Sequence, residues 1–420
     1  MESKPKTGVK KQIGWGLIGQ LTYVVGQFVV LSILARFASP VDVGRFALAG
    51  AIIMPIFAFF NLGLRFNQAT DTERESTFAE YVVLRSLTTT LGYLLILGIG
   101  FFFVGDESTR WILIIFGAAK AVETFSDLFY GVFQREQKMV LVARSQIARS
   151  LISSLFFSGL LIGTNSVEIA FSGHLFSWLL VAFLFDYRKA KRVSASARRV
   201  VTIKSLIAIT RQSLPLGYAG FLARLTASVP RLVIDSVMGL AALGYFTVVA
   251  YALQAGTTVI MAVSHSITSP LSRYSADGKD RAFRRLLFKI IGMFTALGLM
   301  MLPIAFYLGD FLIVLFFGEQ YQGLNILFTL IMAVFIVNTW SNMLQTGLIA
   351  KREFANHAIN RLLLLVLMIV FTLPSAFYGE LEGVALAMAL AYLGQAGFLY
   401  WLLFGNQNRS GREEKGVDCV

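Results

Sequence analysis

The stretch RKAKRVSASARRVVTIK, residues 188–204, contains seven Lys and Arg and no Asp or Glu. On both sides of it the chain passes through a series of apolar segments, each close to the length of about 20 residues that a helix needs to cross the hydrocarbon core of a bilayer. A polar stretch of this kind stays outside the membrane and divides the apolar segments into two groups. The sequence therefore predicts a multi-pass membrane protein with a basic linker near its middle.

Basic residues collect in every second gap between the apolar segments. Of the 37 Lys and Arg, 31 lie in seven such gaps, and the gap around residues 188–204 is the richest. Loops that face the cytoplasm carry an excess of Lys and Arg. The alternation therefore predicts that both termini and the basic linker face the cytoplasm.

The composition agrees with a membrane protein. Hydrophobic residues make up 56% of the chain and charged residues 15%, with a mean hydropathy of +0.69, whereas a soluble domain is typically about 25% charged. The net charge of +13 is spread over the seven gaps and is not gathered on one face. It therefore favours contact with anionic membrane lipids and argues against a nucleic-acid partner.

Cysteine and histidine are too few and too scattered for metal chemistry. Cys419 stands alone in the polar tail, and His174, His265 and His357 lie in separate segments with no HxxxH or HExxH spacing. The metal sites that such motifs form are therefore not expected. We expect no catalytic residue, no metal and no cofactor.

Twelve spanning helices keep both termini on one side, as the charges require. We predict an all-α polytopic membrane protein with twelve transmembrane helices in two six-helix lobes. The predicted helices are 13–34, 43–64, 81–104, 111–133, 141–162, 169–185, 205–227, 232–267, 286–308, 324–349, 362–377 and 383–404. The predicted domains are a first lobe at 1–187, the linker at 188–204, a second lobe at 205–405 and a cytoplasmic tail at 406–420.

A short echo between the two lobes indicates an internal duplication. The sequence Val43-Gly44-Arg45-Phe46 recurs as Leu243-Gly244-Tyr245-Phe246, and each follows the first helix of its lobe. Two parallel repeats of six helices around a central cavity are an architecture of transporters. The predicted outer loops are all short, so the activity of the protein is expected within the bilayer.

Several short segments spread over the chain carry a family resemblance. They are Leu34-Ala35-Arg36-Phe37-Ala38-Ser39-Pro40, Val43-Gly44-Arg45-Phe46-Ala47, Asn61-Leu62-Gly63-Leu64-Arg65, Ala69-Thr70-Asp71, Phe133-Gln134-Arg135 and Leu315-Phe316-Phe317-Gly318-Glu319-Gln320-Tyr321. Together with the helix count and the topology, they resemble the bacterial polysaccharide-repeat-unit flippases of the multidrug/oligosaccharidyl-lipid/polysaccharide exporter superfamily.

The resemblance implies both a fold and a function. The implied fold is a V-shaped bundle of six plus six helices, like that of the multidrug and toxin extrusion (MATE) transporters, in the bacterial cytoplasmic (inner) membrane. The implied function is to flip undecaprenyl-diphosphate-linked oligosaccharide repeat units to the outer leaflet by alternating access, for O-antigen, capsule or exopolysaccharide synthesis. The implied partners are this substrate, membrane lipids, and the polymerase and chain-length proteins of the same pathway. The sugar and the coupling ion, H+ or Na+, are left open.

Ionisable residues far from helix ends are the candidates for headgroup contact, because a charge in hydrocarbon is costly and by default functional. Lys120 lies about ten residues into the predicted helix 111–133, near the middle of the bilayer. Glu123 and Asp127 follow on the same helix face. Lys120 would meet the diphosphate, while Glu123 would pair with Lys120 or carry a coupling proton. The alternative is an internal Lys120–Glu123 ion pair that only holds helices together.

The other site candidates are one arginine and two stripes of uncharged polar residues. Arg224 is the second choice for headgroup contact, and a pairing with another helix is its alternative role. The stripes are Gln20, Tyr23 and Gln27 in the first predicted helix and Asn338, Asn342 and Gln345 in the tenth. We expect the stripes to line a hydrated path for the sugar between the lobes. Hydrogen bonding between helices is the competing account.

Other classes of protein are also compatible with a twelve-helix chain, among them a passive lipid scramblase or an assembly scaffold. A MATE-like efflux antiporter for cationic drugs should carry an acidic residue deep in its first helix, and residues 13–34 contain none. A membrane enzyme of the pathway, such as a polymerase or acyltransferase, tends to need a large outer loop or a buried His. Glycosyltransferase genes beside this gene would favour the flippase.

Overall fold

The computed structural model describes residues 8–71, 76–193 and 201–405. Every regular element in these ranges is a helix, which confirms the predicted all-α fold class. The described residues form two compact units, Met1–Ser228 and Val229–Val420. The predicted lobes divide at the linker instead, part of which lies outside the described residues, and that division stays a prediction.

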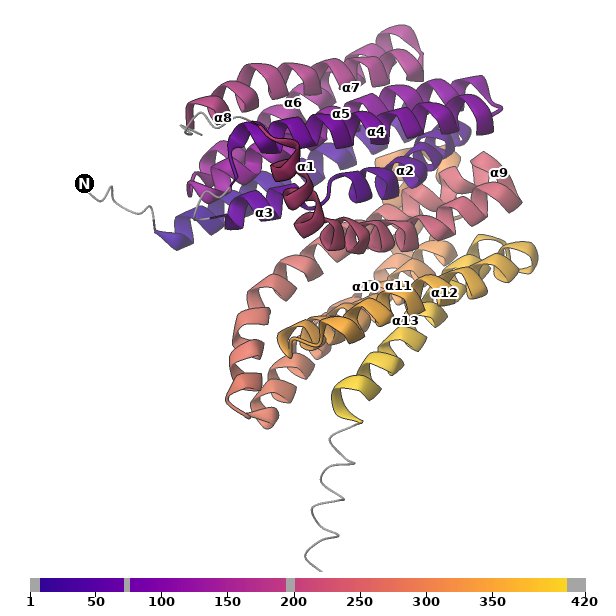
Figure 1. The fold of residues 1–420 in the computed structure, drawn as a ribbon. Coiled ribbons are helices and arrows are strands. Elements are labelled where there is room, and N and C mark those ends of the chain that lie inside the picture. The colour runs from indigo at the N-terminus through magenta and orange to yellow at the C-terminus, as the bar shows by residue number, and fades with distance from the viewer. Residues whose placement is uncertain (1–7, 72–75, 194–200, 406–420) are drawn as a thin grey trace, which may run out of the picture. The chain divides into compact units, whose positions relative to one another are not determined.

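The first unit holds the N-terminal helices (Figure 1). Its elements are α1 (Val9–Phe37), α2 (Pro40–Phe60), α3 (Leu64–Thr70), α4 (Phe78–Phe103), α5 (Glu107–Arg135), α6 (Met139–Thr164), α7 (Val167–Val181), the π-helix η1 (Ala182–Tyr187), α8 (Arg188–Val193) and the start of α9 (Ile203–Ala276). The helix that we predicted to end at residue 185 continues through η1 and α8 to Val193.

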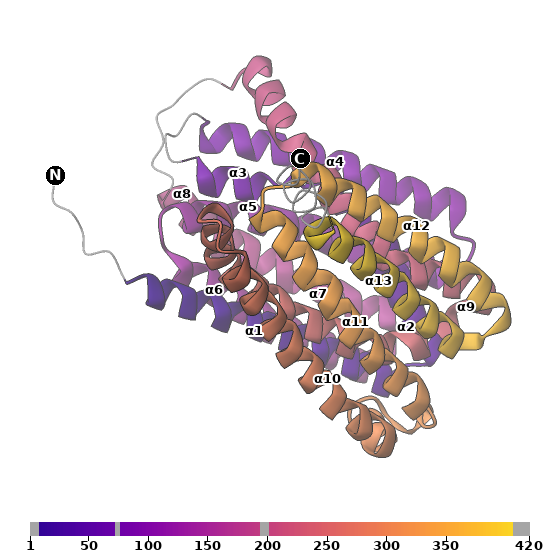
Figure 2. The same ribbon diagram turned by 90° about the horizontal axis from the view of Figure 1, so that it is seen from below.

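The second unit begins inside α9 and contains four further long helices (Figure 2). They are α10 (Asp280–Phe317), α11 (Asn325–Ala350), α12 (Phe354–Tyr378) and α13 (Glu380–Phe404), with the short 3-10 helix η2 (Glu319–Tyr321) before α11. Within this unit α11 packs against both α10 and α13, and α12 packs against α13.

Ten helices among the described residues are long and apolar enough to cross a membrane. The chain is therefore a multi-pass membrane protein, but the predicted count of twelve spans is not confirmed. Two features account for the difference. The 74-residue α9 is counted once although Gly239 interrupts it, and α5 falls outside the ten because charged residues interrupt its apolar sequence.

Side-chain caps fix where several helices of the first unit begin. Ser39 and Thr77 accept hydrogen bonds from the backbone N–H of Asp42 and Glu80, whose carboxylates bond back to the N–H of the capping residue. Asp106 accepts from the N–H of Thr109 and so starts α5. Each cap satisfies helix donors that would otherwise lack a partner, and is worth about 1 kcal/mol.

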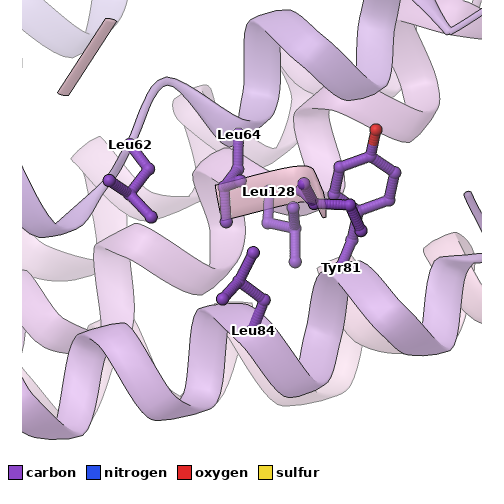
Figure 3. Packing of buried hydrophobic residues seen from close by; sticks show 6 residues of the cluster. Leu62, Leu64, Tyr81, Leu84 and Leu128 are labelled. Atoms are coloured by element: carbon purple, nitrogen blue, oxygen red, sulfur yellow. The ribbon is translucent and has the colours of Figure 1, made fainter. Parts of the chain in front are cut away.

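A small apolar core ties α2–α5 to the start of α9. Leu62 of the α2–α3 turn, Leu64 of α3, Tyr81 and Leu84 of α4 and Leu128 of α5 pack together (Figure 3). Ile209 of α9 completes this cluster. The segment 203–228 therefore belongs by its contacts to the first unit.

Gly239 gives α9 its break. Its φ of 84° and ψ of 177° lie in a region that only glycine adopts readily. A Cβ atom built there has no neighbour within 4 Å, so Gly239→Ala should act through backbone strain alone and cost about 1–3 kcal/mol.

Thermal unfolding of the detergent-solubilised protein measures this cost. Gly397→Ala is the matched control, because Gly397 lies inside α13 and a Cβ atom there also has open space. It should cost nothing, since Ala is a better helix former than Gly. Equal melting temperatures for both variants would contradict the role given to Gly239.

Candidate functional site

Helix α5 lies at the centre of the first unit. It packs against α2, α3, α4, α6 and α7, so protein surrounds most of its circumference. A helix in such a position does not need an apolar surface on all sides, because its polar side chains face other helices and not lipid. This explains how α5 carries Lys120, Glu123 and Asp127 in a membrane protein.

Lys120 and Glu123 form an ion pair on α5. The Lys120 Nζ lies 2.8 Å from Glu123 Oε2, and the Tyr23 hydroxyl of α1 donates to Glu123 Oε1 at 2.6 Å. The Lys120 side chain is 9% exposed and that of Glu123 is 27% exposed. The predicted pairing of Glu123 with Lys120 is therefore present, and the carboxylate also accepts from Tyr23 on a second helix.

Two aromatic rings complete the surroundings of Lys120. Its Nζ lies 4.9 Å from the ring centre of Trp178 and 5.4 Å from that of Phe116. A lysine ammonium carries three donors, and Glu123 takes one of them. The aromatic rings stabilise the cation through their π faces but do not accept as carboxylates or phosphates do. Lys120 is thus held in place with donor capacity left over.

A second, fully buried ion pair lies next to this one. Arg149 of α6 pairs with Asp186 of η1 at 3.2 Å between Nη2 and Oδ2, and the two side chains are 2% and 0% exposed. The Arg149 guanidinium lies 5.0 Å from the ring centre of Trp178, so one indole contacts both Arg149 and Lys120. The His174 ring packs against the same indole in a tilted arrangement, with ring centres 4.7 Å apart, and its Nδ1 bonds to the Ser153 hydroxyl.

The pairing of Arg149 with Asp186 is not among the contacts predicted from the sequence. Arg149 is one of the 31 Lys and Arg that the alternation assigns to cytoplasmic gaps, and this assignment is wrong because its side chain is buried in the helix bundle. Arg85 is assigned in the same way, and it too is fully buried, in α4, where it donates to Asn61. The available signal was Asp186, an acidic residue at the end of an apolar run, which in a membrane protein calls for a cationic partner.

Asp127 lies one turn beyond Glu123 on α5 and has its own partner. Its Oδ1 is 3.1 Å from Nη1 of Arg65 in α3, and each side chain is 33% exposed. Arg65 also lies 5.6 Å from the ring centre of Tyr130. The cluster of these three ion pairs inside the first unit contains three cationic and three anionic side chains. They are Lys120, Arg149 and Arg65, and Glu123, Asp186 and Asp127.

In the described part of the chain, the remaining candidates form no hydrogen bond or ion pair with these charged side chains, although Gln20 and Gln27 flank Tyr23 on α1. Gln20 is exposed and accepts from Gln146 of α6 at 3.4 Å, and Gln27 is half-buried in α1. Arg224 is exposed, and no interaction of the cluster described above includes it. These three residues stay predictions as substrate contacts.

The polar stripe of α11 lies in the second unit. Asn338 is buried and donates to the hydroxyl of Thr257 in α9 at 3.0 Å, while Asn342 donates to the Asn338 side-chain oxygen at 2.7 Å. The bond to Thr257 joins α11 to α9, as the competing account of the stripe describes, while the bond between Asn342 and Asn338 lies within α11. Whether Asn338 and Asn342 also line a path for sugar stays a prediction.

No three His, Cys, Asp or Glu side chains come together as metal ligands in the part of the chain that the structure describes. The contacts observed in the cluster are ion pairs and hydrogen bonds of Lys, Arg, Tyr and carboxylate side chains.

Comparison with known proteins places the chain among proteins of polysaccharide synthesis. A family model described as Polysaccharide biosynthesis protein matches residues 9–272. The chain is 24% identical over 391 residues to the capsular polysaccharide biosynthesis protein CapF of Staphylococcus aureus, and the match covers 91% of this chain and 96% of CapF.

Solved structures of transporters share the fold. The lipid II flippase MurJ in its inward closed conformation has a TM-score of 0.66 at 15% identity, covering 93% of this chain and 87% of MurJ. A point mutant of the Vibrio cholerae MATE transporter VcmN has a TM-score of 0.63 at 14% identity, covering 95% of this chain and 96% of VcmN. Both confirm the predicted fold of the exporter superfamily.

Proposed function

Because the chain belongs to the polysaccharide biosynthesis protein family and has the fold of MATE transporters and of the MurJ flippase, we propose that it flips undecaprenyl-diphosphate-linked oligosaccharide repeat units across the bacterial cytoplasmic membrane. The product would serve the synthesis of a surface polysaccharide, as capsule, O-antigen or exopolysaccharide. The proposed movement is alternating access, with the polyprenyl tail left in the bilayer.

The observation that carries this proposal is the buried cation Lys120 with unused donors. A diphosphate headgroup cannot cross hydrocarbon unaided, because its charges and the sugar hydroxyls would lose their water together. Lys120 is anchored by Glu123 and two rings and still offers N–H groups to phosphate oxygens. A charge-assisted hydrogen bond to phosphate would partly replace the lost hydration.

The neighbouring residues suit this role. The ion pair with Asp186 holds a second cation, Arg149, which also contacts the indole of Trp178. Tyr23 and the two rings fix the carboxylate and the ammonium, so a headgroup would meet a preformed arrangement. In this proposal Glu123 releases Lys120 to the diphosphate, or it carries a coupling proton. H+ and Na+ are both candidates as the coupling ion.

Deletion of the gene tests class and direction together. Lipid-linked repeat units should accumulate on the cytoplasmic leaflet, and the surface polysaccharide should disappear. Complementation with the intact gene should restore both. Loss of repeat-unit synthesis, or accumulation of single repeat units on the outer leaflet, would contradict the proposal and point to an enzyme of the pathway.

We further propose that both termini face the cytoplasm and that polymerase and chain-length proteins of the pathway are partners. Helix α10 tests the topology, because it is one long helix between two turns. Reporter fusions after Asp277 and after Gly323 should report opposite sides, with Asp277 in the cytoplasm. Reporters on the same side, or in the reverse order, would contradict this topology.

A further inference from the structure

The first turns of α10 carry a stripe of basic side chains. Arg281, Arg285 and Lys289 follow one another at intervals of four residues, so they lie on one face of the helix, and all three are exposed. None of them forms a salt bridge with a carboxylate of the described residues. Like charges at this spacing repel one another and destabilise a helix. An anionic partner outside the chain would remove that cost.

The stripe lies just outside the apolar part of α10. Residues 290–309, the twenty positions between Lys289 and Asp310, contain no charged side chain. At 1.5 Å per residue they span about 30 Å, the thickness of the hydrocarbon core. Beyond this stretch, the Asp310 carboxylate accepts from the backbone N–H groups of Gly323 and Asn325 and so holds the turn that follows Phe317. Arg285 and Lys289 therefore stand at the level of the lipid phosphates at the other end.

Aromatic side chains mark the same level on the neighbouring helix α13. Phe288 packs near Tyr400 and Phe404, with ring centres 6.5 and 5.8 Å apart, and Arg284 lies 4.7 Å from the ring centre of Phe404. Tyr400 and Trp401 are 53% and 55% exposed. Exposed Tyr and Trp collect at the boundary between headgroups and acyl chains. The ends of α10 and α13 thus form one interfacial surface.

Below the stripe the exposed face of α10 becomes apolar. Met293, Leu297 and Met300 continue the helix face at intervals of three and four residues, and they are 53%, 43% and 65% exposed. A molecule with a phosphate beside Lys289 would lay its acyl chain along these side chains. The surface therefore combines cations and apolar contacts in the order in which a phospholipid presents its two parts.

We propose that the stripe of Arg281, Arg285 and Lys289 binds the headgroup of an anionic glycerophospholipid, with phosphatidylglycerol as the probe. The three cations take the headgroup phosphate, and the apolar face from Met293 onward takes the acyl chain. This site lies in the second unit and does not depend on the proposed flipping activity. It would anchor the α9–α10 turn in the lipid leaflet on its own side.

Quenching of Trp401 by brominated lipid tests this proposal. The intact protein is placed in phosphatidylcholine vesicles that contain a minor fraction of phosphatidylglycerol brominated on its acyl chains, and separately in vesicles with brominated phosphatidylcholine. The difference from the Trp401→Phe variant isolates the signal of this one indole. Quenching should be stronger with phosphatidylglycerol. Each substitution Arg281→Gln, Arg285→Gln or Lys289→Gln should lower the preference for phosphatidylglycerol over phosphatidylcholine by about fivefold. The lowest possible value is equal quenching by the two lipids.

The matched control replaces three exposed basic residues of α8 instead. The triple variant Arg188→Gln, Lys191→Gln, Arg192→Gln removes the same charge from the first unit and should keep the preference. Circular dichroism checks that all variants stay helical. Three results would overturn the proposal. They are equal quenching by both lipids, a preference that survives loss of the α10 stripe, and an equal loss in the α8 control. Unbrominated competitors are then added to the vesicles with brominated phosphatidylglycerol. If farnesyl diphosphate relieved the quenching of Trp401 more than unbrominated phosphatidylglycerol does at equal charge, the proposal would also be overturned, because the occupant would then be a polyprenyl diphosphate.

Discussion

Lys120→Gln should lower export of surface polysaccharide at least tenfold while the protein still reaches the membrane at normal levels. The substitution keeps polarity and removes the charge, and a hydrogen bond to a charged group is worth about 1.5–3 kcal/mol, which corresponds to tenfold or more. Lys120→Arg keeps the charge and should keep partial activity. Surface polysaccharide and the membrane level of the protein are measured in the same cells. The control is Lys138→Gln, at an exposed lysine before α6, which should transport normally.

The double variant Lys120→Ala, Glu123→Ala separates the two roles of Lys120. If Lys120 only neutralises Glu123, removing both should restore transport although each single variant fails. If Lys120 binds the headgroup, the double variant should stay inactive at a normal membrane level. Because Glu123 also accepts from Tyr23, the carboxylate keeps one hydrogen bond when Lys120 is lost. Full transport by Lys120→Ala alone would remove Lys120 from the site.

Arg149→Leu should destabilise the protein strongly. The substitution leaves the Asp186 carboxylate buried without its cation, and breaking a buried ion pair in this way costs about 3–5 kcal/mol. The double variant Arg149→Leu, Asp186→Leu should recover most of the loss, because apolar side chains often replace a buried pair at little cost. Thermal unfolding in detergent measures the three proteins.

Arg45→Gln is the control for this loss. Arg45 pairs with Asp42 and Asp106 at 2.8 and 3.0 Å, but the Asp106 side chain is 43% exposed. An exposed pair contributes about 0–1 kcal/mol, since water already solvates both charges. The account of Arg149 and Asp186 would be wrong if Arg149→Leu lowered the melting temperature no more than Arg45→Gln does.

The sequence predicts the helices of this protein better than it predicts their partners. Apolar segments of spanning length set the helix positions, and the observed helices cover nearly all of the twelve predicted ranges. The helix after residue 167 runs on past residue 185 because nothing in its basic continuation breaks a helix, and Arg188–Val193 forms α8. The division of α9 depends on one backbone conformation at Gly239. The sequence predicts two helices with a turn near Gly239 in this region, and the break at Gly239 confirms that turn.

The candidate site is predictable only where it is local. Lys120 and Glu123 are three residues apart on one helix, so their pairing follows from helical spacing. Arg149 and Asp186 are 37 residues apart, and Trp178 joins them to Lys120 only after α5, α6 and α7 have packed. A basic residue beside a loop and one inside the bundle look the same in the sequence. Their burial depends on tertiary contacts.

Reconstitution of the purified protein into vesicles tests the flipping proposal most directly. Undecaprenyl-diphosphate-linked oligosaccharide is placed in one leaflet, and its appearance in the other is followed with a sugar-modifying reagent that cannot cross the membrane. The intact protein should make the lipid-linked sugar accessible, Lys138→Gln should match it, and Lys120→Gln should leave the sugar protected. Protection in the presence of the intact protein, under imposed H+ and Na+ gradients as well as without them, would contradict the proposed function.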